Sequence, residues 1–200
     1  MQVLFVHGGT TFKSREEFLD YLRNKPLQIT PRKKWSAEYL TQALGEDFDI
    51  IRPSMPLKEN AQYEDWKIWF ERYLELCSDE LILIGNSLGG IFLAKFLSEN
   101  QLNKKIRSTY LICPPFDNDL DGEDLVGGFE LGDDLSLLEE QGGKLTLLFS
   151  KDDPCVPPRH AHKYREKLPR ARIIVYESKN GHFQVEEFPE LVEMIREDVL

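Results

Sequence analysis

A serine stands between two glycines in the segment Gly85–Gly89, which reads Gly-Asn-Ser-Leu-Gly. A buried-type apolar run precedes this segment and another, 91–94, follows it, which predicts a strand, a sharp turn and a helix. In that setting the Ser87 hydroxyl lies above a sheet at a helix N-terminus, where the helix dipole favours negative charge. Bulkier residues at positions 85 and 89 would hold the strand and the helix apart. The pattern predicts a nucleophilic serine.

A serine hydroxyl needs a general base, and the base needs an acid that orients it. In the strand–turn–helix arrangement the acid and then the histidine follow the serine along the chain. His182 lies in a tight loop after the last predicted strand, and we expect it to be the base. His160 and His162 lie in a predicted helix that follows Pro157 and Pro158, and we expect both to point outward.

Two adjacent aspartates follow the fifth predicted strand, and both stand beyond its carboxyl end. The segment continues as Asp-x-x-Val-Pro from Asp153, the usual form of this loop in folds with such a serine turn. We therefore expect Asp153 to be the acid and Asp152 to cap the loop, with the choice between them open.

An acyl-transfer site also needs N–H groups that stabilise an oxyanion. The N–H of Leu88, directly after the serine, is one candidate donor. The second is expected from the loop after the first strand, where Gly9 or Thr10 would donate. His7 precedes these residues, and we expect it to hold the loop rather than to act as a base.

Six short apolar runs predict strands that are covered on both faces. They are residues 3–6, 49–51, 81–84, 108–112, 145–149 and 172–176. Helical spacing of apolar residues over 66–77 and 188–199 predicts core-facing helices. The alternation predicts a single three-layer α/β/α domain, residues 1–200, with a mostly parallel six-stranded sheet.

Two segments interrupt this alternation at the carboxyl edge of the sheet, where ligands bind in such folds. Residues 12–34 include a capping-box pattern at Ser14–Glu17 and a basic turn at Pro31–Lys34. Residues 115–143 are rich in acids. We expect both insertions to form a cap or pocket walls, and acids at the pocket mouth would disfavour anionic substrates.

The chain has 200 residues, and its formal net charge of −10 makes it a poor candidate for binding nucleic acid. Between Asp117 and Glu140 there are ten acids and no Lys or Arg, so this segment carries the whole imbalance. We expect a solvated loop there, with a protein-docking surface as an alternative. Its start, Asp117–Gly122, matches half of a calcium loop, but position twelve is Gly128 rather than Glu, and we expect no metal site.

Three widely spaced cysteines, Cys77, Cys113 and Cys155, argue against a disulfide framework and favour a cytoplasmic location. No apolar run is long enough for a membrane helix, and Met1–Val6 does not have the form of a secretory signal.

The sequence resembles the α/β-hydrolase superfamily, and within it the small serine hydrolases of the retinoblastoma-binding protein 9-like family. The resemblance covers nearly the whole chain and follows four motifs: His7-Gly8, Gly85–Gly90, Asp152–Pro157 and Gly181-His182. It implies a compact fold with strand order 2-1-3-4-5-6. It also implies hydrolysis of an ester, thioester or amide of a small-molecule acyl substrate, through an acyl-enzyme and without a cofactor.

Two other functions stay open on the residues alone. The same fold serves as a non-catalytic ligand- or protein-binding module, although such proteins usually lose one member of the serine, aspartate and histidine set. Acyl transfer and C–C bond cleavage on this fold use the same residues and cannot be separated from hydrolysis. Nucleotide chemistry is poorly supported, because the chain has neither a P-loop nor a dinucleotide-binding glycine pattern.

Overall fold

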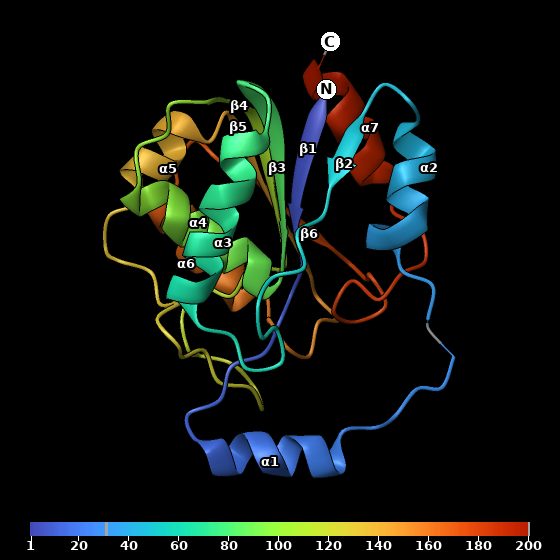
Figure 1. Cartoon of the computed structure of the whole chain (residues 1–200), viewed down its shortest axis with the longest axis vertical. Helices are drawn as coiled ribbons and strands as arrows, with labels where there is room; N and C mark the ends of the chain where they lie inside the picture. The colour runs from blue at the N-terminus through green and yellow to red at the C-terminus, as the bar shows by residue number, and fades with distance from the viewer. Residues whose placement is uncertain (31, 200) are drawn as a thin grey trace.

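Six parallel strands form one central sheet in the order β2-β1-β3-β4-β5-β6, as expected (Figure 1). The structure is a computed structural model, and it describes residues 1–30 and 32–199. The strands are β1 (Gln2–Val6), β2 (Asp49–Ile51), β3 (Glu80–Asn86), β4 (Lys105–Ile112), β5 (Lys144–Ser150) and β6 (Arg172–Tyr176). Each covers its predicted apolar run, and the central strands β3, β4 and β5 extend beyond it by one to three residues at an end.

Helices cover both faces of the sheet and complete the three layers. On one face lie α3 (Tyr63–Leu76), α4 (Leu88–Glu99), α5 (Ser136–Gln141) and α6 (Arg159–Lys167). On the other lie α2 (Leu40–Leu44), which follows an irregular turn η1 (Trp35–Tyr39), and α7 (Pro189–Val199). Strands covered on both faces lose most of their apolar surface to the core, which is why their sequences are apolar on consecutive residues.

The apolar stripe of α3 packs on α4 through aromatic rings. Trp66 and Phe70 are fully buried and contact Phe92 edge to face, with ring centroids 5.7 and 5.3 Å apart. Trp69 and Tyr73, which belong to the same expected stripe, lie at its margin and are only partly buried. This packing fixes α4, and therefore the N-terminus of α4, against the sheet.

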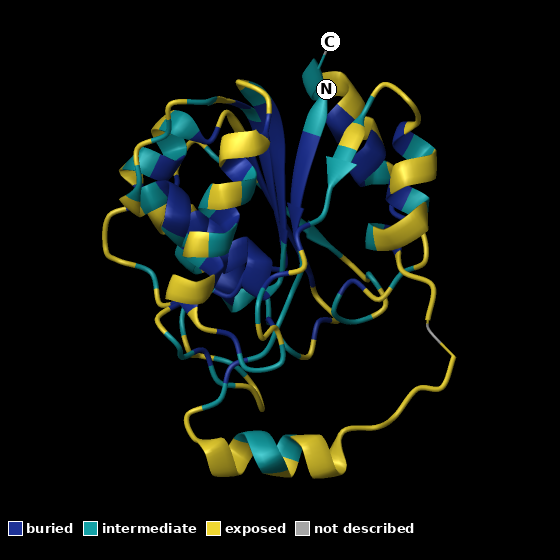
Figure 2. Cartoon of the chain, in the orientation of Figure 1, coloured by how far each residue is buried: buried dark blue, intermediate teal, exposed yellow. Residues whose placement is uncertain are grey.

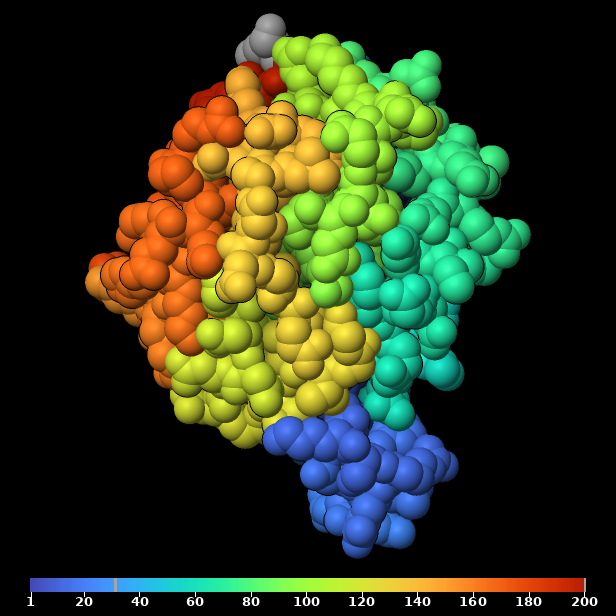
Figure 3. Space-filling view, turned by 90° about the vertical axis from the view of Figure 1, so that its left-hand side faces the viewer, coloured from blue at the N-terminus to red at the C-terminus, as the bar shows by residue number. Residues whose placement is uncertain are grey.

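Helix α1 (Arg15–Asn24) stands apart from the three layers, beyond the carboxyl edge of the sheet (Figures 1 and 3). It begins with the expected capping box of Ser14 and Glu17 but continues for ten residues. None of its residues is buried (Figure 2). Its aromatic contact with the body is Phe12, whose ring lies 5.5 Å from Phe18 and 5.0 Å from Tyr21. Of the expected basic turn, Pro31 lies outside the described residues, and 32–34 run without regular structure.

Residues 115–143 are mostly irregular, and helix α5 near their end is an element that the acidic sequence did not predict. A β-bridge between Thr11 and Asp124 joins this segment to the start of the other insertion. None of the described helices is both long and apolar enough to cross a bilayer.

Candidate active site

Ser87 occupies a strained turn between β3 and α4. Its backbone angles are φ 55° and ψ −119°, a region that non-glycine residues rarely adopt. This conformation makes the sharp turn between the strand and the helix. A Cβ atom at Gly85 would lie 2.4 Å from the Gly89 carbonyl oxygen, and one at Gly89 would lie 2.3 Å from that of Val6. Only glycine at both positions lets strand and helix approach this closely.

His182 lies between a serine and an aspartate and contacts both. Its Nε2 is 2.9 Å from the Ser87 Oγ, and its Nδ1 is 2.8 Å from the nearer carboxylate oxygen of Asp153. With a proton on Nδ1, the ring donates to Asp153 and accepts from the Ser87 hydroxyl. The structure thus brings together the three side chains that the sequence singled out, from the ends of β3, β5 and β6.

The carboxylate of Asp153 is buried and held by its own loop. One of its oxygens accepts hydrogen bonds from the N–H groups of Cys155 at 2.9 Å and Val156 at 3.0 Å. These bonds explain the spacing between Asp153 and Val156, because the carboxylate caps the turn that leads to α6 while its other oxygen faces His182.

Asp152 points to a different partner set. Its carboxylate accepts from the hydroxyls of Ser150 and Ser178 and from the N–H groups of Lys179 at 3.0 Å and Gly181 at 2.9 Å. The two hydroxyl bonds, followed by the two N–H bonds, hold the pKa of this carboxyl far below its usual value. Asp152 therefore ties the loop after β5 to the loop that carries His182, which is a capping role.

Cys113 is a site residue that the sequence argument missed. Its Sγ lies 3.8 Å from the His182 Nε2, and it is fully buried with φ 41° just after β4. Its place beyond the carboxyl end of a central strand was the available signal. Burial raises the pKa of this thiol and so keeps it neutral.

The charge state of His182 follows from opposing effects. Burial disfavours the imidazolium, but the hydrogen bond to the Asp153 carboxylate and its negative charge favour it, and the net pKa lies above the usual 6.5. Ligand atoms of Cys113, Asp153 and His182 lie within 4.8 Å of one another, a spacing that a metal ion would accept. Both ring nitrogens of His182 already face a serine and a carboxylate, so the geometry fits proton transfer better than ligation.

The two proposed sources of oxyanion donors differ in availability. Leu88 is the first residue of α4, where a backbone N–H has no partner within the helix. Gly9 lies beside it, since a Cβ there would be 3.1 Å from the Leu88 side chain. The N–H of Thr10, in contrast, donates to the Lys58 carbonyl at 2.8 Å. Gly9 is therefore the better candidate for the second oxyanion donor.

His7 holds the loop after β1. Its Nε2 accepts from the Met55 N–H at 3.0 Å, and its Nδ1 lies 2.6 Å from the Gly8 carbonyl oxygen. Burial lowers its pKa, so the ring stays neutral at pH 7. The structure assigns this histidine a positioning role, as expected.

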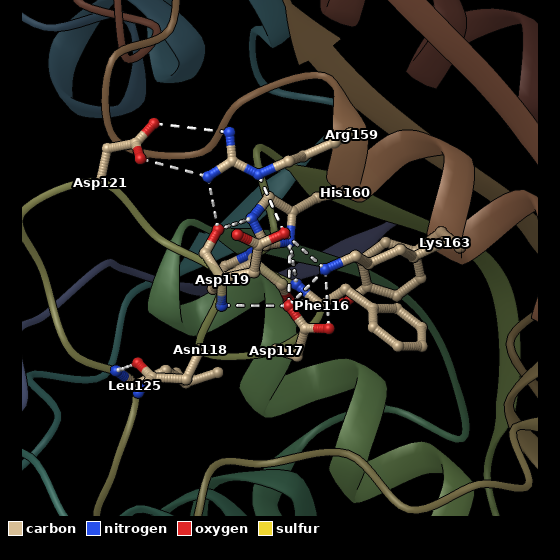
Figure 4. A network of polar contacts seen from close by, with 11 residues as sticks. Phe116, Asp117, Asn118, Asp119, Asp121, Leu125, Arg159, His160 and Lys163 are labelled. Carbon is tan, nitrogen blue, oxygen red and sulfur yellow. Dashed lines mark hydrogen bonds and ion pairs between the residues drawn. The ribbon is translucent and has the colours of Figure 1, made fainter.

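The expectation that His160 points to solvent is wrong. The side chain is fully buried, its Nδ1 accepts from the Phe116 N–H at 3.0 Å, and its Nε2 donates to the Asp119 carbonyl at 3.0 Å (Figure 4). The buried residues Ala161 and Tyr164 mark the core face of α6, and His160 lies four residues before Tyr164 on that face. That spacing was a signal for burial. His162, on the opposite side, is exposed as expected.

The acids at the start of the 117–140 segment are balanced by cations of α6. Lys163 contacts both Asp117 and Asp119, with nitrogen–oxygen distances of 2.8 and 2.9 Å, and Arg159 reaches Asp119 and Asp121 (Figure 4). The three carboxylates that suggested half a calcium loop are therefore held by ammonium and guanidinium groups. Docking of a protein partner on this segment stays a prediction.

The sheet order and the strained serine turn after β3 define the α/β-hydrolase fold. A family model described as serine hydrolase matches residues 30–195, so the chain belongs to the serine hydrolase family. This confirms the family resemblance drawn from the four motifs.

Solved structures match over nearly the whole chain at low identity. The ydeN gene product of Bacillus subtilis has a TM-score of 0.77 and 18% identity, over 99% of this chain and 98% of that one. Naproxen esterase of B. subtilis has a TM-score of 0.64 and 12% identity, over 100% and 83%. A meta-cleavage product hydrolase of Pseudomonas fluorescens has 0.63 and 14%, over 100% and 90%. A search of curated proteins gave no match. At these identities the structural matches establish the fold.

Proposed function

We propose that this protein hydrolyses a carboxylic ester, thioester or amide through a Ser87–His182–Asp153 triad. The observation that carries the proposal is the position of His182, which lies within hydrogen-bond distance of both Ser87 and Asp153. A neutral imidazole oriented by a carboxylate is the arrangement that activates a serine hydroxyl.

In the proposed reaction His182 Nε2 takes the proton of Ser87 as the Oγ–carbon bond forms at the substrate carbonyl. The N–H groups of Leu88 and Gly9 stabilise the oxyanion. Collapse of this intermediate breaks the bond to the leaving group, which receives the proton from His182. Water then repeats the sequence and releases the acid, so no cofactor is required.

The two insertions supply the walls of the proposed site. Residues Gln28 and 32–34 line a cavity beside His182, and Glu123 and Asp124 line another that reaches Thr10 and Phe12. Both cavities lie at the carboxyl edge of the sheet, where this fold binds substrates.

Labelling with a neutral fluorophosphonate tests the proposal, because this reagent forms a stable bond to an activated serine. Wild type should label with one equivalent, and Ser87→Ala should not label. His182→Ala should label about 10⁶-fold more slowly, because the serine and the base act as a unit. A folded wild-type protein that does not label would overturn the proposal and favour a binding module. If Ser87 does label, turnover of a panel of esters and a panel of amides would assign the acyl chemistry.

A further inference from the structure

A cavity of about 340 Å³ opens beside His182, within the size range of small-ligand sites. Asn86, His182 and Phe183 form the wall that belongs to the core of the fold. Gln28, Arg32, Lys33 and Lys34 of the first insertion line the cavity as well, together with Trp35 and Ser36 at the start of η1. The cavity thus joins the proposed general base to the most basic run of the chain.

The charge of this cavity is opposite to that of the protein. Three cationic side chains, Arg32, Lys33 and Lys34, line it, and none of its described lining residues is Asp or Glu. The whole chain carries −10. The described part of the chain gives none of the three cations an ion-pair partner, and Arg32 donates to the neutral amide oxygen of Gln184 at 2.5 Å. Cations without a local partner at a cavity wall attract anions.

The acidic residues near the basic run line two other cavities and not the one beside His182. Glu38, Glu186 and Glu187 line a neighbouring cavity that the same three cations also border. Glu17, Asp20, Glu123 and Asp124 line the cavity next to Thr10, on the side of the acidic segment. Asp20 and Asp124 are ion-paired with Arg23 and Lys13, so Glu17 and Glu123 remain as the acids that repel an anionic group on the Thr10 side. On the side of residues 32–34 the cations attract it.

The part of a substrate that this cavity would hold follows from the reaction. His182 must deliver a proton to the leaving group, so the leaving group lies next to its Nε2. His182 lines the cavity, whereas Leu88 and Gly9, the proposed oxyanion donors, do not. The cavity is therefore placed for the alcohol or amine portion of the substrate.

We propose that the site selects substrates whose leaving group carries a carboxylate, held by Lys33 and Lys34 with Arg32 beside them. The proposal rests on the proposed hydrolase function. It reverses the expectation that acids around the pocket would disfavour anionic substrates, because the acidic and basic residues face different cavities.

Three acetate esters of matched phenols test the preference: 3-acetoxybenzoate, 3-acetoxybenzamide and 3-acetoxyphenyl-trimethylammonium. Each kcat/KM is divided by the rate of hydroxide-catalysed hydrolysis, which corrects for the different leaving-group reactivities. Wild type should prefer the carboxylate ester over the amide ester by about tenfold at low salt. The preference should fall as salt rises, because exposed charges are screened.

The variant Lys33→Gln/Lys34→Gln should reduce this carboxylate-to-amide ratio about fivefold or more. The matched control is Lys67→Gln/Arg165→Gln, which removes the same charge from α3 and α6 at positions that line neither cavity. Its ratio should equal that of wild type. Equal ratios in both double variants, or a wild-type preference for the trimethylammonium ester, would overturn the proposal.

A fourth ester, mono-4-nitrophenyl glutarate, places the carboxylate on the acyl side. If Lys33→Gln/Lys34→Gln lowers kcat/KM for this ester alone, the assignment of the cavity to the leaving group is wrong.

Fluorophosphonate labelling tests the proposed hydrolase function separately from the proposed charge preference, since the probe carries no charge. If the protein labels but the ester panel shows no preference for the carboxylate, only the assignment of the cavity is rejected. If the protein does not label, the hydrolase function itself is rejected.

Discussion

Asp152 and Asp153 are neighbours in the chain, but their carboxylates bind different loops. Asp153 accepts from Cys155 and Val156 and faces His182 at 2.8 Å, whereas Asp152 accepts from Lys179 and Gly181. One carboxylate therefore contacts the imidazole, and the other holds the backbone on which the imidazole is carried. The pair fixes both the orientation of the ring and the position of its loop.

Substituting each aspartate separates these roles. Asp153→Asn should slow fluorophosphonate labelling by about 10⁴-fold, because the amide favours the wrong tautomer of His182. Asp152→Asn should retain much more activity but lower the stability of the fold, since it weakens three hydrogen bonds between two loops and a fourth to Ser150. Labelling rates and urea unfolding of both variants check this. A greater loss of labelling in Asp152→Asn would assign the acid to that residue instead.

The pH dependence of labelling should report His182. The base acts only when neutral, so the rate should rise with pH and level off once the imidazolium has lost its proton. Because the hydrogen bond and the charge of Asp153 outweigh the effect of burial, the midpoint should lie above pH 6.5. Asp153→Asn should move the midpoint down. A wild-type midpoint at or below 6.5 would show that the ring is not stabilised as a cation.

Much of this site could be predicted because local sequence determines it. The turn at Ser87 needs glycine on both sides. The apolar run 81–84 that precedes it is too short for a buried helix, which favours a strand. The order of the motifs then leaves His182 as the histidine at the correct edge of the sheet. Parallel strands end at the same edge, so topology brings residues that are 95 positions apart into contact.

Other features depended on packing between distant segments. The spacing of His160 to Tyr164 on α6 indicates burial, but the hydrogen-bond partners of His160, Phe116 and Asp119, lie in a distant segment that no local pattern of α6 reveals. The basic run 32–34 has no periodicity, and its place beside His182 is set by the path of an irregular segment. The length of α1 was also unexpected, since a capping box marks where a helix begins but not where it ends.

The close approach of Gly89 to β1 predicts a sharp cost for one methyl group. In Gly89→Ala the new Cβ would lie 2.3 Å from the Val6 carbonyl and 2.6 Å from that of His7, and neither backbone group can move freely. We expect a loss of about 3 kcal/mol in the free energy of unfolding, together with slower labelling of Ser87. Gly132→Ala is the control, since nothing lies within 4 Å of its Cβ position. Equal stabilities in urea would contradict this account.

His160 and His162 form a natural pair for testing the network of Figure 4, because they lie two residues apart on α6. His160→Ala removes the acceptor of the Phe116 N–H and leaves a cavity, and should cost about 3 kcal/mol at pH 7.5. His162→Ala removes an exposed side chain and should change stability by less than about 0.5 kcal/mol. Urea midpoints with a common slope measure both, and similar losses in the two variants would refute the structural role of His160.

The cost of His160→Ala should also depend on pH in a fixed direction. Burial lowers the pKa of His160 in the folded protein below the usual 6.5, against weaker opposing effects of Asp119 and Asp117. As pH falls through 6.5 the unfolded chain therefore binds a proton that the folded chain does not, and wild type loses stability. His160→Ala has no titrating group at this position. The difference in the free energy of unfolding between variant and wild type should therefore be smaller at pH 5.5 than at pH 7.5. The pKa of His7 is lowered too, but His7 is present in both proteins and cancels. A larger difference in the free energy of unfolding at pH 5.5 would mean that His160 binds a proton in the folded state. A protonated Nδ1 could not accept the hydrogen bond from Phe116, so this result would contradict the structure.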